Sequence, residues 1–337
     1  MTSYGITVMR GRILDIAAMA VQAERNGYDT VWSPEFYTRS AVVTLTQIAA
    51  TTLSARIGSS IAYAVGRSPL TIATEARSLD EVSNGRLVLG LGTGTRRMTY
   101  DWHGTDPTAP ATRMEELIPL LRRLWRLHEG PVHHEGRFYR VDVRPTAEVD
   151  PPVRTDLPIY TAGVNDRMVQ VAGRVANGFL GHPVFSPDYV MEHVRPSIAI
   201  GAARADRDPA EIAVCGLVIC AVGADEEQAR RDAAAQLAFY TAPKAYAPVM
   251  ERQGFGAAAA AIRDAFAAGD LDAMVAAVPD RMIDTFAVAG TPTQVRDQLR
   301  RYDKVLDHVI VYPPSFRMTA ERCNAALRAA VTHATPR

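Results

Sequence analysis

The chain has 337 residues, and its 37 basic and 37 acidic side chains leave a formal net charge of zero. This balance provides no overall field to attract nucleic acid or an anionic membrane surface. With 47% hydrophobic and 22% charged residues, the composition is that of a folded globular protein and excludes disordered and fibrous chains.

Targeting and cross-linking signals are also missing from the sequence. No stretch approaches the roughly 20 consecutive apolar residues of a membrane span, and residues 1–11 lack the basic start and apolar run of a signal peptide. The three cysteines (Cys215, Cys220 and Cys323) are too few and too unevenly spaced for a disulfide framework or a zinc site. We therefore expect a cytoplasmic enzyme with no nucleic-acid or membrane partner.

Apolar strand-like runs alternate with amphipathic helical runs along the chain. The predicted strands are 5–9, 28–32, 56–62, 86–92, 158–162, 178–181, 212–221 and 308–312. The predicted helices are 13–26, 42–53, 69–84, 113–127, 166–176, 187–203, one that starts at 291–292, and 319–332. Continuous apolar strands separated by helices indicate a parallel sheet that helices cover.

Two segments interrupt this alternation. Residues 129–157 contain a predicted hairpin around Gly136 and a proline-rich return, and residues 225–279 are helical and rich in alanine. The remaining eight strand–helix pairs predict an α/β fold, a (β/α)8 TIM barrel that forms a single domain over residues 1–337. A doubly wound sheet is the alternative.

The active site of such a barrel lies at the carboxyl ends of the strands, so the residues after each strand are the site candidates. Glu35 follows the second strand and is either a catalytic carboxylate or half of a structural salt bridge. His103 and His182 follow the fourth and sixth strands, and the neighbouring Trp102 favours a functional role for His103. No group of histidine and acidic residues has the spacing of metal ligands, so we expect no metal.

Two segments of small residues are candidates for cofactor binding. Residues 161–165 (TAGVN) open a predicted helix, whose free N–H groups and dipole favour a phosphate. Arg167 adds a positive charge there, although an ordinary helix capped by Asn165 has the same pattern. Residues 90–94 (GLGTG) match no complete dinucleotide fingerprint and are either part of a cofactor site or a tight turn that needs glycine.

Several segments together resemble the luciferase-like monooxygenase superfamily. They are residues 58–69 (GSSIAYAVGRSP), 79–92 (LDEVSNGRLVLGLG), 102–104 (WHG), 158–163 (PIYTAG) and 176–183 (ANGFLGHP). Within that superfamily the chain is most similar to the deazaflavin-dependent reductases, such as methylenetetrahydromethanopterin reductase. The resemblance implies a (β/α)8 barrel, oxidoreductase activity, coenzyme F420 as the cofactor and a homodimer.

The resemblance also implies roles for individual residues. A bulge after the third strand, with a cis peptide bond between Ser60 and Ile61, would back the cofactor ring, and the N–H groups of residues 163–165 would hold its phosphate. Several deazaflavin relatives carry Asp-His after the second strand, where this chain has Pro34-Glu35. Glu35 and His103 are the candidates for the catalytic proton donor. The expected cofactor-binding residues are Ser60, Ile61, Gly92, Thr93, Gly94, Thr161, Ala162, Gly163, Val164, Asn165, Arg167, Gly181 and His182.

Two other functions remain open from the sequence. An FMN-dependent monooxygenase on the same barrel would need a partner reductase to supply reduced flavin. A non-catalytic barrel would bind a cofactor or ligand without turnover. No motif identifies the small-molecule substrate, and residues 225–279 are expected to cover its pocket.

Overall fold

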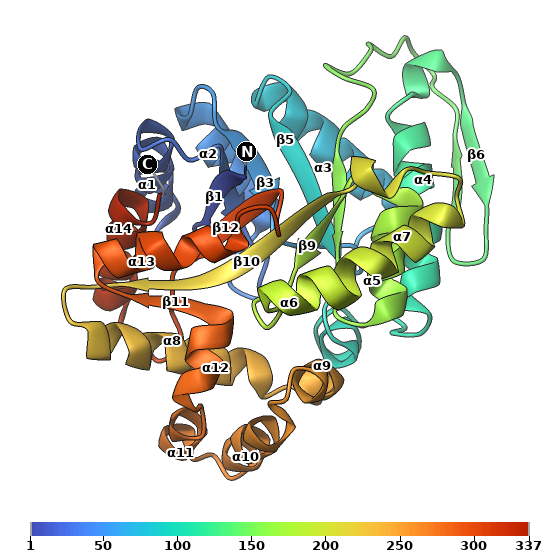
Figure 1. Ribbon diagram of the computed structural model, residues 1–337. Helices are drawn as coiled ribbons and strands as arrows, with labels where there is room; N and C mark the ends of the chain where they lie inside the picture. Colours follow the sequence, from blue (N-terminus) through green and yellow to red (C-terminus); the bar gives the residue numbers. More distant parts are fainter. Residues whose placement is uncertain (1, 336–337) are drawn as a thin grey trace. The chain divides into compact units, whose positions relative to one another are not determined.

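The computed structural model describes residues 2–335 (Figure 1). Its eight barrel strands, in their hydrogen-bonded order, are β1 (Ser3–Thr7), β2 (Thr30–Ser33), β3 (Arg56–Ser59), β5 (Leu87–Gly92), β8 (Ile159–Ala162), β9 (Gly178–Gly181), β10 (Ala213–Val222) and β12 (His308–Tyr312). Pairing of β12 with β1 and of β9 with β10 closes the sheet. The predicted (β/α)8 barrel is therefore confirmed.

Helices follow these strands along the chain. They are α1 (Ile13–Arg25), α2 (Ala41–Thr51), α3 (Pro69–Val82), α4 (Pro110–Leu124), α5 (Asp166–Val175), α6 (Pro187–Tyr189), α7 (Arg195–Ala203), α13 (Pro292–Leu299) and α14 (Ala320–His333). Short helical turns lie at η1 (Met98–Trp102), η2 (Leu127–Glu129), η3 (Val190–Val194), η4 (Pro209–Glu211), η5 (Lys244–Tyr246) and η6 (Arg300–Tyr302). No helix in residues 2–335 combines the length and the apolar character that crossing a membrane requires.

Proline chemistry accounts for two of the differences between the predicted and observed helices. Helix α4 begins at Pro110, three residues before the predicted start, because proline at the first helical position loses no hydrogen bond. The single helix predicted over 187–203 is instead divided into α6, η3 and α7. Pro196 has no N–H to continue the regular hydrogen-bond pattern there, which accounts for the wider turn before it.

The two segments that interrupt the alternation contain the predicted hairpin and the predicted helices. Residues 132–143 form an antiparallel hairpin of β6 (Val132–Glu135) and β7 (Arg140–Val143). The second segment contains α8 (Glu226–Thr241), α9 (Ala247–Arg252), α10 (Gly256–Ala267) and α11 (Leu271–Ala276), and α12 (Asp280–Phe286) begins directly after it. Strand β11 (Ala287–Gly290), which pairs with β10, was not predicted, because four apolar residues are too few to show a period.

The described chain divides into two compact units. The first unit holds residues up to 31, residues 181–195 and residues from 214 onward, and the second holds residues 32–180 and 196–213. In the first unit, β12 pairs in parallel with both β1 and β10. In the second unit, β5 pairs with β3, with the short strand β4 (Ala62–Tyr63) and with β8.

Arginine and glutamate side chains attach the loops of the second unit to its core. Arg154 binds the buried carboxylate of Asp80, with Nη2 2.7 Å from Oδ1. Glu116 of α4 accepts hydrogen bonds from the N–H groups of Phe138 and Tyr139 and thereby holds the β6–β7 turn. Each bond satisfies backbone or carboxylate groups that the fold takes out of water.

Gly90 provides a test of strand packing in the second unit. A Cβ at this position would lie 1.8 Å from the Ser59 carbonyl oxygen, and backbone cannot move aside cheaply. We expect Gly90→Ala to lower the free energy of unfolding by more than about 3 kcal/mol in urea titrations.

Gly223→Ala is the matched control, because its Cβ would meet nothing closer than 3.6 Å. We expect this control to change the unfolding free energy by less than about 1 kcal/mol. Equal stabilities of the two variants would contradict the strand geometry described here.

Candidate active site

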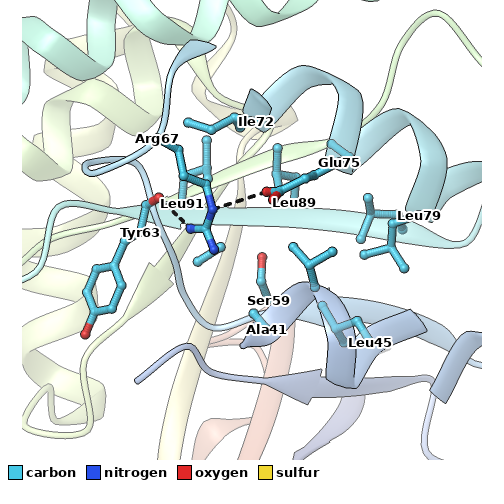
Figure 2. A pocket seen from close by; sticks show the side chains of 14 residues that line it. Ala41, Leu45, Ser59, Tyr63, Arg67, Ile72, Glu75, Leu79, Leu89 and Leu91 are labelled. Carbon is cyan, nitrogen blue, oxygen red and sulfur yellow. Dashed lines mark hydrogen bonds and ion pairs between the residues drawn. The ribbon is translucent and has the colours of Figure 1, made fainter. Parts of the chain in front are cut away.

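Glu35 is fully engaged by its neighbours in the second unit. Its Oε2 accepts hydrogen bonds from Arg67 Nη1 at 2.7 Å and from the Tyr63 N–H at 2.9 Å, and its Oε1 accepts from Arg67 Nη2. Arg67 also pairs with Glu75, 3.2 Å from Nε to Oε2 (Figure 2). The hydrogen bonds to Glu35 raise the pKa of Arg67 although burial opposes them. Of the two roles that the sequence allowed for Glu35, the structure contains the salt bridge, with Arg67 as the partner.

An apolar cavity lies beside this ion-pair network. Figure 2 shows that it is bordered by Ala41, Leu45, Ile72, Leu79 and Leu89, from α2, α3 and β5. None of the expected cofactor-binding residues lines it. We interpret the cavity as a packing gap between helices and strands and do not include it in the active site.

His103 lies close to the Glu35 network through a shared neighbour. Its ring contacts the Tyr63 ring at a centroid distance of 4.7 Å, and the Tyr63 N–H donates to Glu35. The Nε2 atom of His103 is buried and has no hydrogen-bond partner within residues 2–335. A buried ring nitrogen without a partner is available to bind a ligand or carry a proton.

Aromatic rings surround the loop that carries His103. Trp102 meets Phe36 and Tyr37 edge-on, at centroid distances of 5.3 and 5.4 Å. The structure therefore brings the two predicted proton donors, Glu35 and His103, to one cluster of neighbours. The part played by Tyr63 was missed at the sequence level, because its contacts join residues that are far apart along the chain.

The residues expected to back a cofactor ring come together at the carboxyl ends of β3, β5 and β8. The peptide bond between Ser60 and Ile61 is cis, as the resemblance implied. A Cβ on Gly92 would lie 2.7 Å from Ile61 Cδ1 and 3.6 Å from Ala162 Cβ, so the missing side chain leaves room for Ile61. Ser60 Oγ and Thr161 Oγ1 are buried and have no partner in the described chain.

The neighbouring turn of β5 has its own internal bonds. Gly94 has φ +67, a conformation that favours glycine, and Thr93 Oγ1 donates to the Gly94 carbonyl at 3.3 Å. The Thr93 carbonyl accepts from Thr99 Oγ1 at 2.9 Å. The tight-turn interpretation of this segment is therefore satisfied by the structure, whether or not a ligand also contacts it.

Residues 161–165 form the predicted helix entry. Asn165 caps α5, because its Oδ1 accepts from the Met168 N–H at 2.9 Å. A Cβ on Gly163 would lie 2.3 Å from Met168 Cβ, so packing alone requires glycine there. The N–H groups of Val164 and Asn165 have no hydrogen-bond partner among residues 2–335. These two donors lie where the resemblance places the cofactor phosphate, and the phosphate site stays a prediction.

Arg167 has a partner that the sequence did not indicate. Both of its Nη atoms bind the Glu115 carboxylate of α4, with 2.6 Å between Nη2 and Oε2, and Arg174 binds the same carboxylate. Burial would raise the pKa of Glu115, but the hydrogen bonds and charges of these arginines hold it below its usual value. Because Glu115 neutralises its charge, Arg167 contributes less to anion binding than its sequence position suggests.

Gly181 and His182 belong to the first unit, where His182 lies among tyrosines. Its ring is 4.3 Å from the Tyr246 ring and 4.9 Å from the Tyr240 ring. Burial lowers the pKa of His182 to about 3, so the imidazole is neutral at physiological pH. Tyr240 and Tyr246 come from residues 225–279, whose alanine-rich pattern contains no signal that singles them out.

The ionisable side chains of residues 2–335 form no metal-binding cluster. Within residues 2–335, no group of three or more histidine, cysteine, aspartate or glutamate side chains has an arrangement that could hold a metal ion. In the candidate site, the polar groups without partners in the described chain are the Ser60 and Thr161 hydroxyls, the His103 ring nitrogen and the two backbone N–H groups, which suit an organic ligand.

Comparison with known proteins adds to this geometry. A family model described as luciferase-like monooxygenase matches residues 3–308. The chain is 32% identical over 298 residues to 5,10-methylenetetrahydromethanopterin reductase of Methanolobus tindarius, covering 88% of this chain and 87% of the relative. The solved coenzyme F420 dependent tetrahydromethanopterin reductase of Methanopyrus kandleri matches with a TM-score of 0.83 and 27% identity over 98% of each chain.

A more distant structure shares the fold alone. The FMN complex of the oxygenating constituent of 3,6-diketocamphane monooxygenase from Pseudomonas putida matches with a TM-score of 0.69 and 15% identity. It covers 100% of this chain and 98% of that chain. The same barrel thus occurs in proteins named for either cofactor.

Proposed function

Because the chain belongs to the luciferase-like monooxygenase family, we propose that it is a coenzyme F420-dependent oxidoreductase acting on a small organic substrate. The observation that carries this proposal is the arrangement of Ile61, Gly92 and Ala162 beside the Ser60–Ile61 bond. The similarity to reductases named for tetrahydromethanopterin and coenzyme F420 supports it. Because the relatives described above are oxidoreductases, we do not propose that the chain is a non-catalytic barrel.

The residues at the ends of β3, β5 and β8 fit a planar ring. Ile61 and Ala162 offer apolar surface, and Gly92 places no side chain between them. Ser60 Oγ, which has no partner in the described chain, is free to hydrogen-bond a polar edge of the ring. The N–H groups of Val164 and Asn165 would hold the phosphate, aided by the dipole of α5.

The bound deazaflavin would supply a hydride, and the chain must then position the substrate and deliver a proton. Glu35 is poorly suited to proton delivery, because Arg67 and the Tyr63 N–H already occupy both of its oxygens. His103 Nε2 is buried and has no partner within residues 2–335. We therefore assign proton donation to His103 and assign Glu35 to positioning Arg67 and the Tyr63 loop.

The second candidate is an FMN-dependent monooxygenase supplied by a partner reductase. The FMN complex that shares this fold is the observation that favours it. Both candidates require the same ring-binding region, so cofactor identity separates them. A homodimer, which the resemblance implied, is compatible with either one.

Titration of the purified chain with each cofactor tests the proposal. We expect coenzyme F420 to bind at least about tenfold more tightly than FMN, which corresponds to about 1.4 kcal/mol. Fluorescence of the deazaflavin and of the flavin reports both dissociation constants directly. Tight binding of FMN without binding of coenzyme F420 would replace the reductase with the monooxygenase.

The roles of His103 and Glu35 are separable by matched substitutions. We expect His103→Ala to keep its cofactor affinity and to lose about 10²–10⁴-fold in kcat, the usual contribution of general acid catalysis. Glu35→Gln keeps a hydrogen-bond acceptor for Arg67, so we expect a loss of less than about tenfold. The measurement is turnover at saturating cofactor beside the dissociation constant. Wild-type turnover in His103→Ala would assign the proton to another donor.

A further inference from the structure

Three aromatic rings of the second unit form a cluster beside the proposed proton donor. Phe36 and Tyr37 directly follow Glu35 in the loop after β2, and Trp102 directly precedes His103 at the end of η1. The rings of Phe36 and Tyr37 are 4.2 Å apart, and the Trp102 ring meets both of them edge-on. Phe36, Tyr37 and Trp102 are called the aromatic cluster below.

Much of the aromatic cluster is open to solvent. The Tyr37 side chain is 73% exposed and Trp102 is 42% exposed, whereas the other two tryptophans, Trp32 and Trp125, are each 1% exposed. Single exposed apolar side chains are ordinary, but exposed rings that contact one another mark a place where a ligand or partner binds. Covering them removes apolar surface from water, which favours binding.

Backbone hydrogen bonds attach the first part of the cluster to the candidate active site. The N–H groups of Phe36 and Arg39 each donate to the carbonyl of the other at 2.9 Å, which closes the turn that carries Tyr37. The Glu35 N–H donates to the carbonyl of Ile61, also at 2.9 Å. The turn is therefore tied directly to the residue that we expect beneath the cofactor ring.

The loop that carries Trp102 is held in the same way. Thr99 Oγ1 donates to the Thr93 carbonyl at the end of β5, at 2.9 Å. A Cβ on Gly66 would lie 2.7 Å from His103 Nδ1, so the His103 ring packs directly on the loop after β4. The aromatic cluster and the proposed proton donor therefore belong to the same preformed loops, which reduces the ordering cost of binding a ligand there.

The angles between the rings indicate which class of ligand fits. The plane of Trp102 is turned by 89° from the planes of Phe36 and Tyr37. A planar aromatic ring can therefore stack on one of these side chains and meet another edge-on, and aromatic pairs prefer both arrangements. A saturated ring of the same size has no aromatic face and gains neither contact.

We propose that the aromatic cluster binds a planar aromatic ring of the substrate. The proposal rests on the proposed function, because it takes the loop of His103 as part of the active site. A protein partner is a poorer match to the size of the cluster. An aromatic side chain buries about 150–250 Å2, so three partly exposed rings supply less than the roughly 800 Å2 that each partner contributes to a stable protein interface.

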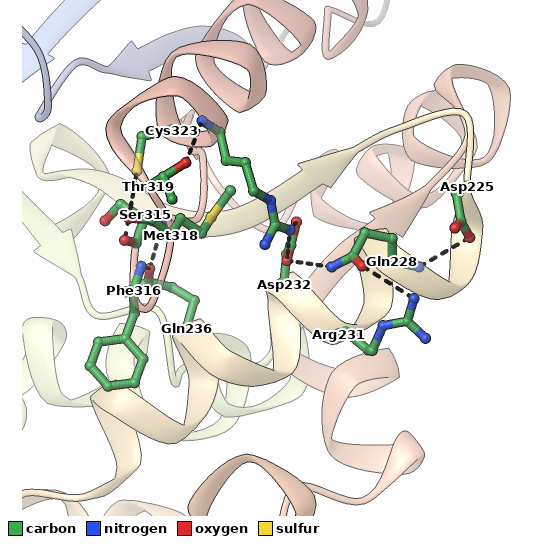
Figure 3. A network of polar contacts seen from close by, with 11 residues as sticks. Asp225, Gln228, Arg231, Asp232, Gln236, Ser315, Phe316, Met318, Thr319 and Cys323 are labelled. Atoms are coloured by element: carbon green, nitrogen blue, oxygen red, sulfur yellow. Dashed lines mark hydrogen bonds and ion pairs between the residues drawn. The ribbon is translucent and has the colours of Figure 1, made fainter. Parts of the chain in front are cut away.

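The first unit contains an aromatic pair that serves as a matched control. Phe239 of α8 is 38% exposed, and its ring lies 5.0 Å from the ring of Phe316. The Phe316 N–H donates to the buried Gln236 side chain at 3.0 Å, so this pair belongs to the attachment of α8 to the loop after β12 (Figure 3). Phe239 thus matches Trp102 in exposure and in ring contact, but its sequence neighbours include no proposed proton donor.

Calorimetric titration with two ketones tests the ligand class. Acetophenone and cyclohexyl methyl ketone have the same size and carbonyl group and differ in whether the ring is aromatic. We expect acetophenone to bind the wild-type chain with a dissociation constant of about 1 mM, as for a small neutral ligand. We expect cyclohexyl methyl ketone to bind at least about threefold more weakly, because it forms no ring–ring contacts. Equal affinities, or no binding of acetophenone, would overturn the proposal.

Substitutions by leucine locate the binding, because leucine keeps apolar surface and removes the ring. We expect the acetophenone dissociation constant to rise at least about threefold in Trp102→Leu and about twofold in Tyr37→Leu, and to stay at the wild-type value in Phe239→Leu. Acetophenone should quench the tryptophan fluorescence of the wild-type chain and not that of Trp102→Leu, because the two remaining tryptophans are buried. Equal losses in Trp102→Leu and Phe239→Leu would contradict the site. Far-ultraviolet circular dichroism checks that each variant is folded.

Titrations with and without coenzyme F420 separate this proposal from the cofactor assignment. Binding of acetophenone through Trp102 without binding of coenzyme F420 would support the aromatic site and remove the cofactor assignment. Binding of coenzyme F420 without binding of acetophenone would overturn the aromatic site alone. Sedimentation tests the other occupant. A Trp102→Leu chain that loses a dimer and keeps wild-type ketone binding would make the cluster a protein interface and overturn the proposal.

Discussion

In the second unit, two aromatic rings pack directly against glycines of the barrel strands, where a side chain would not fit. The Trp32 ring lies where a Cβ on Gly58 would be, 2.4 Å away, and the Tyr160 ring occupies the same relation to Gly178. The two rings are 6.4 Å apart and tilted by 33°. Because neither glycine can accept a side chain, the aromatic packing beneath the strand ends cannot be rearranged without moving the backbone. The proposed ring-binding region includes the ends of β3 and β8, the strands that carry Gly58 and Tyr160.

The arginines of the chain differ in whether a carboxylate already binds their guanidinium group. Arg167 was an expected cofactor-binding residue, and Arg67 lies in the loop after the third barrel strand. Each is bound through two Nη atoms to a glutamate, Arg67 to Glu35 and Arg167 to Glu115. Such pairs fix loops and helices relative to one another within the second unit and leave little charge for a ligand. Arg10, in the first unit, is exposed and has no such partner in the described chain. Whether an arginine has a carboxylate partner therefore decides more than its place in the sequence whether its charge is available to a ligand.

Much of the fold was predictable because its signals are local. The alternation of apolar strands and amphipathic helices depends on neighbouring residues, and all eight barrel strands were found where that pattern placed them. The cis bond at Ser60–Ile61 followed from family resemblance alone. Strand β11 escaped prediction because its four residues carry no period, and Tyr246 because its contact with His182 joins segments far apart in sequence. The Glu35–Arg67 pair was open to two interpretations until the structure supplied the geometry.

We propose that Ile61, which occupies the space left by the missing side chain of Gly92, supports the cofactor ring. The most direct test is the coenzyme F420 dissociation constant of Gly92→Ala, whose new methyl group would displace only the flexible end of Ile61. The account predicts a rise of at least about tenfold, with an unfolding free energy within about 1 kcal/mol of wild type and with Gly223→Ala binding as wild type. An unchanged dissociation constant in a folded Gly92→Ala variant would contradict it.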